Sequence, residues 1–533
     1  MSTTSSQGME SMAPSNPQQF KLSGLQKLGL AVGAFSILLI LTGVSGHILL
    51  SPNIHFWFIL GSASLGVLIY AYAVYSDSDP GIKNNGVWFY QLTNRGAAAW
   101  VLGIVLTGFY VLLYWYPETL GLGTGQTGEN TGLVAVFDPL SQALKGKPAS
   151  QWFVYGTLYT LAILIFGGKF LYKYRHNKYQ IWRTISVMFF QLAFAFLLPE
   201  FLLAMDLPYN DFKNMWPLNY YFFDGWNIKQ MMSSGTLGIC MLVWGVAMIF
   251  IVSPMLTYFY GKRWYCSWVC GCGGLAETAG DPFRHLSDKS IQAWKIERWL
   301  VHGVLVFVVV MTLGVLYSFF TNEATNILLS RNFLVIFVSI SGTTLLMWMW
   351  LDSYRFRELD QKAKWLSTGI GVFLMVVLLV SHFSGFNTLY VADISGPLRK
   401  WYGFLIGAAF SGVVGVGFYP LLGNRVWCRF GCPMAAILGI QQKFFSRFRI
   451  TTNGGQCISC GNCSTYCEMG IDVRAYAQKG QNIVRASCVG CGICAAVCPR
   501  GVLKLENGSL DISEKTDQKH IQFVREDEVR VLH

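Results

Sequence analysis

Long runs of apolar residues, separated by short polar segments, fill the chain from residue 28 to residue 422. A helix needs about 20 apolar residues to cross the hydrocarbon core of a bilayer. The pattern therefore predicts a polytopic α-helical membrane protein with about ten transmembrane helices. The predicted spans are 28–50, 56–75, 96–116, 152–172, 182–205, 235–258, 299–320, 332–351, 365–385 and 403–422.

Composition and charge agree with a membrane protein. Of the 533 residues, 53% are hydrophobic and 13% are charged, whereas soluble domains have about 25% charged residues. Cytoplasmic loops are rich in Lys and Arg. With the N-terminus inside, the inner segments carry 19 of these residues and the outer loops carry 7. We therefore expect membrane lipid around the chain, both termini in the cytoplasm and a location in the bacterial cytoplasmic (inner) membrane. The net charge of +12 then reflects the excess of Lys and Arg in the inner segments, and no nucleic-acid partner is expected.

Eight cysteines near the C-terminus fall in two groups that share the spacing C-x2-C-x2-C-x3-C. This run holds [4Fe–4S] clusters, and the fourth cysteine of each group ligates the cluster of the other group. The spacing predicts a small α+β ferredoxin-like domain that carries two clusters and transfers single electrons. The predicted ligands are Cys457, Cys460, Cys463 and Cys498 for cluster 1, and Cys488, Cys491, Cys494 and Cys467 for cluster 2.

Other residues of this domain suggest how the clusters are held. Gly461, Gly490 and Gly492 are expected to permit the tight turns that aim thiolates at the iron. Glu468 stands where a proline usually follows the fourth cysteine. A negative charge there is expected to lower the reduction potential of cluster 2, because reduction adds charge of the same sign.

A second cysteine pattern repeats next to the membrane. The segments that begin at Gly261 and Gly423 both read G-x-R-x-(aromatic)-C-x3-C. On a helix this spacing puts two sulfurs on one face, so two such pairs would offer four thiolates for an iron–sulfur cluster or another metal. The alternative is that these cysteines pack between helices as small apolar residues. The candidate ligands are Cys266, Cys270, Cys428 and Cys432, and Cys272 extends the first copy only.

Three polar residues near the outer ends of predicted spans are candidates for a quinone or haem site. They are His47, Glu200 and His382. Together they could bracket a quinol, and the two histidines could ligate a haem, because polar groups within spans often mark function. The commoner case is a histidine at the membrane interface that binds water and backbone.

These patterns divide the chain into five parts. Residues 1–22 are rich in Ser, Gln and Pro and are expected to be disordered. The remaining parts are an N-terminal membrane domain at 23–235, a membrane domain with the repeated cysteine pairs at 236–439, a [4Fe–4S] domain at 440–510 and a charged tail at 511–533.

The two C-x3-C segments, the WCRFGCP motif that ends at Pro433 and the ferredoxin pair resemble the membrane polyferredoxins related to NapH, NosR and CcoG. The resemblance covers roughly residues 240–505, and this chain departs from it at Gly271, where the family usually has proline. The resemblance implies electron transfer along or across the cytoplasmic membrane, commonly from the quinol pool toward a periplasmic reductase or an assembly reaction.

The main hypothesis is an integral membrane protein that transfers electrons between the quinone pool, or a cytoplasmic donor, and a partner respiratory enzyme or cytochrome. One alternative is an assembly factor that handles a metal such as copper for a respiratory oxidase or reductase. A second alternative is a subunit of a redox-driven ion pump, although the spans hold few charges suited to an ion path. No side chains are predicted as a nucleophile or an acid–base pair.

Overall fold

The computed structural model describes residues 22–48, 50–76, 95–123, 128–322, 330–352, 356, 359, 361–383, 392–508, 522–525 and 528–530. In these residues nine helical segments are long and apolar enough to cross a membrane, so the chain is a multi-pass membrane protein, as the hydrophobic pattern predicts. Six spans are single helices: α2 (Gly24–Val44), α3 (Pro52–Tyr75), α4 (Ala97–Trp115), α7 (Gln151–Lys173), α16 (Arg331–Leu351) and α17 (Gln361–Phe383). A seventh, α15, runs over Ile291–Asn322.

Two further spans contain a π-helical segment. One consists of α8 (Lys178–Phe189), η3 (Phe190–Leu197) and α9 (Leu198–Ala204); the other consists of α11 (Gly235–Ala247), η4 (Met248–Val252) and α12 (Ser253–Tyr260). Such π-helical insertions are rare and frequently lie at functional sites.

The tenth predicted span is not a regular helix. In place of one helix over 403–422, the chain forms α18 (Ala392–Tyr402), the π-helix η6 (Gly403–Val414) and α19 (Tyr419–Leu422). Glycine weakens a helix by about 1 kcal/mol per position relative to alanine, and this segment uses glycine for close contacts. A Cβ on Gly412 would lie 3.0 Å from the ring of Tyr114.

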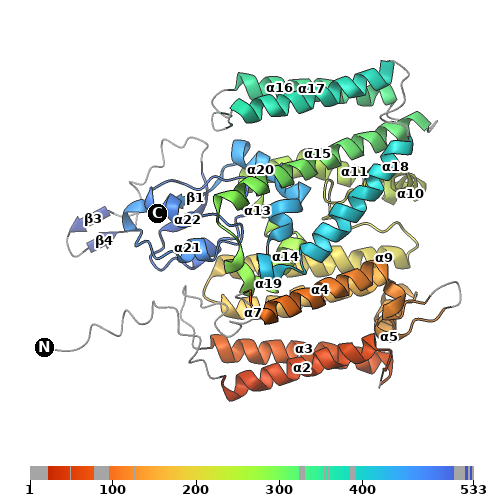
Figure 1. The fold of residues 1–533 in the computed structure, drawn as a ribbon, viewed down its shortest axis with the longest axis vertical. Coiled ribbons are helices and arrows are strands. Elements are labelled where there is room, and N and C mark those ends of the chain that lie inside the picture. Colours follow the sequence, from red (N-terminus) through yellow and green to blue (C-terminus); the bar gives the residue numbers. More distant parts are fainter. Residues whose placement is uncertain are drawn as a thin grey trace.

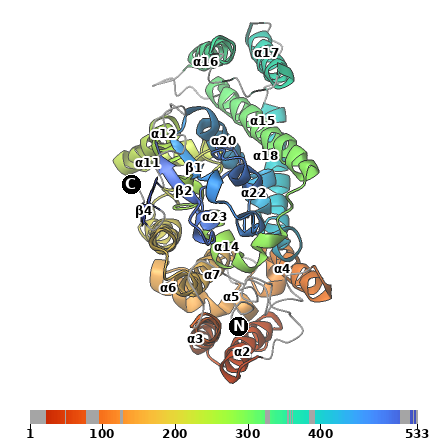
Figure 2. The same cartoon turned by 90° about the vertical axis from the view of Figure 1, so that its left-hand side faces the viewer.

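The spans form an elongated assembly. The α2–α3 hairpin lies at one end of the long axis and the α16–α17 hairpin at the other (Figures 1 and 2). Short elements lie at one end of the helices: η2 (Pro117–Leu120), α5 (Gly132–Val136), α6 (Asp138–Lys145) and α10 (Gly225–Ser233). Toward the opposite end lie α13 (Arg263–Cys266), α14 (Gly271–Thr278), η5 (Asp281–Leu286), η7 (Trp427–Gly431) and α20 (Pro433–Phe445).

The ferredoxin domain projects beyond that second end (Figure 1). Its sheet is one antiparallel pair, β1 (Phe448–Thr452) with β2 (Leu503–Asn507), in which Phe448 lies opposite Asn507. The cysteine loops carry η8 (Gly454–Gln456), α21 (Asn462–Thr465), α22 (Val473–Gln478) and α23 (Ile493–Ala496). This is the predicted small α+β domain. Of the predicted tail, only β3 (Gln522–Arg525) and β4 (Glu528–Arg530) are described, and the predicted disordered segment lies outside the described residues except for residue 22.

The α2–α3 hairpin depends on glycine contacts and gives a testable prediction. A Cβ on Gly66 would lie 2.6 Å from the backbone nitrogen of Gly33, whereas a Cβ on Gly61 of the same helix meets nothing within 4 Å. We expect Gly66→Val to lower the free energy of unfolding by about 1–3 kcal/mol through overpacking, and Gly61→Val to change it little. Thermal unfolding in detergent measures both, and equal melting temperatures for the two variants would contradict the packing.

Candidate functional site

The two C-x3-C segments fold alike. The first cysteine of each pair lies in a short helical turn, Cys266 in α13 and Cys428 in η7. The second cysteine has an extended backbone and precedes a helix, Cys270 before α14 and Cys432 before α20. In both copies its amide donates to the carbonyl five residues earlier, at 2.8 and 2.9 Å. The pair is thus not on one continuous helix, as the spacing suggested, but the repeat in sequence is a repeat in structure.

The glycine that opens each copy is required by its backbone. Gly261 has φ +67° and ψ 179°, and Gly423 has φ +97° and ψ 170°. Only glycine adopts this region readily. A Cβ on Gly261 would also lie 2.6 Å from Oε1 of Gln442. These glycines turn the chain out of one helix and into the cysteine segment.

The four cysteines of the two pairs lie in one buried apolar cluster with Tyr265 and Trp427, each of them 8% exposed or less. Burial raises the pKa of Cys266 to about 12 and that of Cys428 above its usual value. Without a bound cation these two thiols are therefore neutral, whereas a coordinating metal deprotonates a thiol outright. Four buried thiols that interact electrostatically with one another are a donor set that suits a metal or an iron–sulfur cluster.

The structure places ferredoxin cysteines of both groups side by side. One cavity is lined by Cys457, Cys460, Cys463 and Cys498 together. The thiol of Cys494 interacts electrostatically with those of Cys491, Cys488, Cys467 and Cys463. The four cysteines predicted for cluster 1 thus line one cavity, and the crossed assignment of both clusters stays a prediction.

Turns and amide donors shape both loops, as the glycine pattern predicts. Gly461, Gly490 and Gly492 have φ of +80°, +64° and +75°, so the expectation of tight turns at all three is confirmed. The amide of Ser464 donates to the Cys463 sulfur and that of Gly490 donates to the Cys488 sulfur. Hydrogen bonds to sulfur are among the factors that set cluster potentials.

The cluster 2 loop is fastened to the membrane domain. Six of the seven carbonyl groups in residues 485–491 accept hydrogen bonds, at 2.5–2.9 Å, from side chains of the membrane domain or, in two cases, from Gln442 of α20. The donors are Gln442 to Arg485 and Cys488, Lys262 to Ala486, Ser267 to Val489, Tyr179 to Gly490, and Gln180 to Cys491. Cluster 2 therefore has one defined position relative to the cysteine pairs.

Beneath this loop lies a buried ion cluster of seven charged side chains, each 3% exposed or less. Arg425 pairs with Glu277 and, at 3.0 Å, with Glu468. Arg284 pairs with the same Glu468 at 2.6 Å. The acids are Glu277, Asp281 and Glu468, and the cations are Lys173, Arg183, Arg284 and Arg425.

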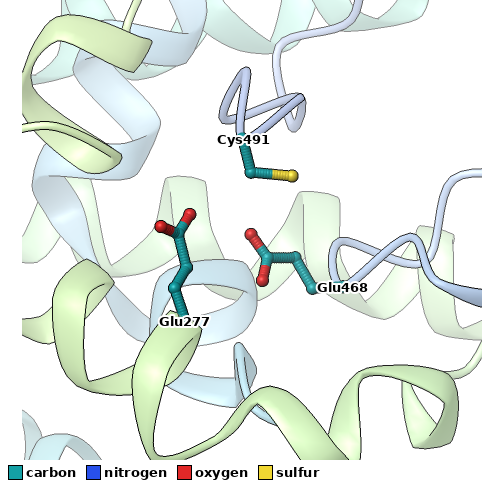
Figure 3. Close-up of side chains that lie close together, drawn as sticks. All are labelled: Glu277, Glu468 and Cys491. Carbon is teal, nitrogen blue, oxygen red and sulfur yellow. The ribbon is translucent and has the colours of Figure 1, made fainter. Parts of the chain in front are cut away.

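The ion cluster sets the charge of Glu468. Burial alone would raise the pKa of this carboxyl group, but Arg284 and Arg425 hold it at about 2. Its negative charge is therefore fully formed and is compensated by the two arginines, and its expected effect on the reduction potential of cluster 2 stays a prediction. Glu277, Glu468 and the sulfur of Cys491 point toward one another within 4.8 Å (Figure 3). The arginines already occupy both carboxylates, so we interpret this contact as the junction between cluster 2 and the ion cluster and not as a further metal site.

Arg425 also reaches the cysteine pairs. Its Nη1 donates to the sulfur of Cys428 at 3.6 Å and to the carbonyl of Cys266 at 3.4 Å. The equivalent arginine of the first copy, Arg263, points the other way. It stacks on Phe448 and donates to Asn507 at 3.0 Å. One repeat arginine thus touches the candidate metal centre, and the other holds the ferredoxin domain.

A cavity of about 260 Å³ lies beside the cysteine pairs. Cys270 and Cys272 line it, and so do Asp211 and Lys213, which lie between the fifth and sixth predicted spans. Trp427 and Asn214 also line it, and in the described residues the buried atoms Nε1 of Trp427 and Oδ1 of Asn214 have no hydrogen-bond partner. Further walls come from α7 and from the π-helices η3 and η6.

The structure does not bring the other three candidates together. His47 follows α2 and contacts the carbonyl of Ser45 at 2.9 Å, and His382 ends α17 beside Tyr317. These helices lie at opposite ends of the long axis (Figure 1). Glu200 pairs with Lys145 at 2.9 Å. Within one chain, His47 and His382 are therefore not placed to share a haem, and the three residues do not bracket one quinol site, because similar depth in the membrane does not imply lateral proximity.

Comparison with known proteins bears on both cysteine regions. Residues 456–503 match the family described as "4Fe-4S dicluster domain". The chain carries [4Fe–4S] ferredoxin-type domains. Residues 242–290 and 404–451 match the family described as "4Fe-4S binding domain", and each of these segments contains one C-x3-C pair. The cofactors shown by these matches are two [4Fe–4S] clusters.

A similar curated protein is YccM of Escherichia coli (strain K12), described as a proposed electron transport protein. It is 23% identical to this chain over 250 residues, which are 46% of this chain and 52% of the relative. The match therefore spans about half the length of that protein. No solved structure matches the chain. The specific relation to NapH, NosR and CcoG stays a prediction.

Crossed ligation can be tested with pairs of substitutions. We expect Cys498→Ser to remove cluster 1 and about four iron atoms. Adding Cys457→Ala should cost no further iron, because both cysteines belong to cluster 1. Adding Cys488→Ala should remove about four more iron atoms, because cluster 2 is then lost as well. Iron and sulfide analysis of the purified variants distinguishes crossed from uncrossed ligation. Uncrossed ligation would be shown if Cys457→Ala removed further iron and Cys488→Ala did not.

The ion cluster predicts a large effect of Arg425→Met. The change leaves Glu277 and Glu468 buried with one cation fewer, and breaking a buried pair costs about 3–5 kcal/mol. We expect a marked fall in melting temperature, partly restored by adding Glu277→Gln. Arg447→Met, which removes a cation stacked on Tyr258, is the matched control. A melting temperature that falls no more for Arg425→Met than for this control would contradict the role of the ion cluster.

Proposed function

We propose that this protein is an integral membrane iron–sulfur protein that relays single electrons between a water-soluble redox protein and the membrane. The relay comprises cluster 1, cluster 2 and a third centre at the two cysteine pairs. The charge asymmetry of the loops supports a ferredoxin domain in the cytoplasm of a bacterial cell. The description of YccM as a proposed electron transport protein points the same way.

The observation that carries the proposal is the contact path from cluster 2 to the cysteine pairs. The sulfur of Cys491 lies within 4.8 Å of the carboxylates of Glu277 and Glu468. Arg425 binds both carboxylates and donates to the sulfur of Cys428. A sulfur of cluster 2 is thus joined to a sulfur of the cysteine pairs through one arginine and either glutamate, all three of which are buried.

In this proposal Cys266, Cys270, Cys428 and Cys432 hold an iron–sulfur centre. The match of both segments to a 4Fe-4S binding family supports iron. Cys270 and Cys432 each precede a helix, where backbone amides favour a thiolate; those of Cys272 and Gly273 donate to the Cys270 sulfur, and that of Ala435 donates to the Cys432 sulfur. When bound, the centre would supply one-electron chemistry within the membrane domain.

The membrane end of the relay would be the cavity beside Cys270. Trp427 and Asn214 line this cavity, and each has a buried polar atom without a partner in the described residues. If these side chains turn toward a quinone ring, Nε1 of Trp427 would donate a hydrogen bond to it and Oδ1 of Asn214 would accept one. Tyr155, Tyr159 and Tyr402 supply aromatic walls. We therefore propose this cavity as the quinone site, in place of His47, Glu200 and His382.

A second candidate function is favoured by Cys272. Its thiol hydrogen-bonds with that of Cys270, and both line the cavity. Two adjacent soft ligands suit Cu(I). In that case the protein would reduce or hand over copper during assembly of a respiratory enzyme, and the clusters would supply the electrons.

Reoxidation by quinone tests the relay. The purified protein, embedded in lipid nanodiscs with menaquinone, is reduced by a low-potential reductant, and cluster absorbance is then followed after the reductant is removed. We expect Cys432→Ser to slow reoxidation at least about tenfold, because the third centre is lost while the ferredoxin clusters remain. Cys240→Ser, which changes an exposed cysteine on α11, should leave the rate unchanged.

The outcomes separate the two functions. If the clusters of the wild-type protein do not exchange electrons with menaquinone, the proposed relay to quinone is contradicted. Binding of one Cu(I) per chain that depends on Cys270 and Cys272, without electron exchange with quinone, would favour the assembly function instead.

A further inference from the structure

The two ferredoxin clusters differ in their access to solvent. The loop of cluster 2 is covered by the membrane domain, through hydrogen bonds such as Ser267 to Val489 and Gln180 to Cys491. At cluster 1, by contrast, Cys460 is exposed and Ile458 is 43% exposed. A protein that exchanges electrons with this domain from the aqueous side would therefore meet the cluster 1 loop.

Four exposed cations belong to this region: Arg474, Lys479, Arg500 and Lys504. We call them the basic face. Arg474 and Arg500 line the same cavity as the cysteines of cluster 1. Lys479 directly follows α22, and Lys504 is adjacent to Leu503, which also lines that cavity. In the described residues, no ion pair joins any of these cations to a carboxylate.

The acidic residues of the domain are occupied elsewhere. Within 453–508 they are Glu468, Asp472 and Glu506. Glu468 is buried in the ion cluster. Asp472 accepts hydrogen bonds from Ser464 and from the first turn of α22. Glu506 lies opposite Arg449 in the β1–β2 pair. The surface around cluster 1 is thus positive, with an exposed apolar residue, Ile458, beside the cluster.

We infer that the basic face docks an acidic one-electron carrier protein, which exchanges electrons with cluster 1. This inference rests on the proposed relay and names the class of its water-soluble partner. Complementary charge steers such encounters and raises association rates by about 10–1,000-fold at low salt. An apolar contact at Ile458 beside the cysteines would let the redox groups approach closely. One electron leaves the carrier and reduces cluster 1, and no bond forms or breaks.

The test compares two reductants of the full-length protein in nanodiscs. One is a purified acidic [2Fe–2S] ferredoxin in its reduced form, and the other is photoreduced 5-deazariboflavin, which is small and uncharged. We expect Arg474→Glu with Arg500→Glu to slow reduction by the ferredoxin at least about tenfold at low salt. Reduction by deazariboflavin should be unchanged. The wild-type rate with ferredoxin should fall as salt rises, because salt screens exposed charges.

A matched control makes the same change of charge at the other end of the molecule, by Lys229→Glu with Lys400→Glu. Both lysines are exposed, and the ferredoxin reaction should be unaffected. Equal ferredoxin rates in wild type and the Arg474/Arg500 variant would overturn the docking surface. The docking surface would also be overturned if the salt dependence of the ferredoxin reaction disappeared when residues 511–533 were deleted. That result would mean that the basic face binds this segment of the chain. Failure of deazariboflavin to reduce any cluster would instead contradict the proposed relay itself.

Discussion

A buried ion cluster between the membrane domain and the ferredoxin domain fixes the geometry on which the rest of this protein depends. Removing charges from water costs several kcal/mol per ion, and only well-placed partners offset that cost. Glu468 can therefore be buried only when Arg284 and Arg425 are both in place. The ions come from the ferredoxin domain, from α7, α8, α14 and η5, and from the second cysteine segment. All of these segments must consequently dock together.

This constraint explains why the two cysteine segments are similar but not interchangeable. Each needs its positive-φ glycine to turn the chain, and each places its second cysteine before a helix. Their arginines then take different tasks: Arg425 joins the ion cluster to the sulfur of Cys428, whereas Arg263 binds the ferredoxin sheet at Phe448. The first copy also carries Cys272 toward the cavity. The repeated cysteine segment thus provides a candidate metal centre whose two halves have different surroundings.

Short sequence patterns were enough to predict the features that depend on short segments of the chain. Ferredoxin ligands follow from spacing within a short loop, and the turns at Gly461 and Gly492 follow from the same loop. Nine of the spans follow from length and hydropathy, while the tenth forms as α18, η6 and α19 in place of one regular helix, with Gly412 packed against the ring of Tyr114. The cavity could not be predicted, because Asn214 and Trp427 meet only through long-range packing. Long-range packing is also why the sequence could not show that His47 and His382 lie far apart, or which arginines compensate Glu468.

The central claim is that the four cysteines of the two pairs hold an iron–sulfur centre in contact with the ferredoxin clusters. Mössbauer spectroscopy of the full-length protein enriched in ⁵⁷Fe tests it most directly, by comparison with the variant Cys266→Ser/Cys428→Ser. Two [4Fe–4S] clusters account for about eight iron atoms. The account predicts additional iron in the wild type, whose spectral component is missing from the variant while the ferredoxin components persist. Identical spectra, with about eight iron atoms in both proteins, would contradict it.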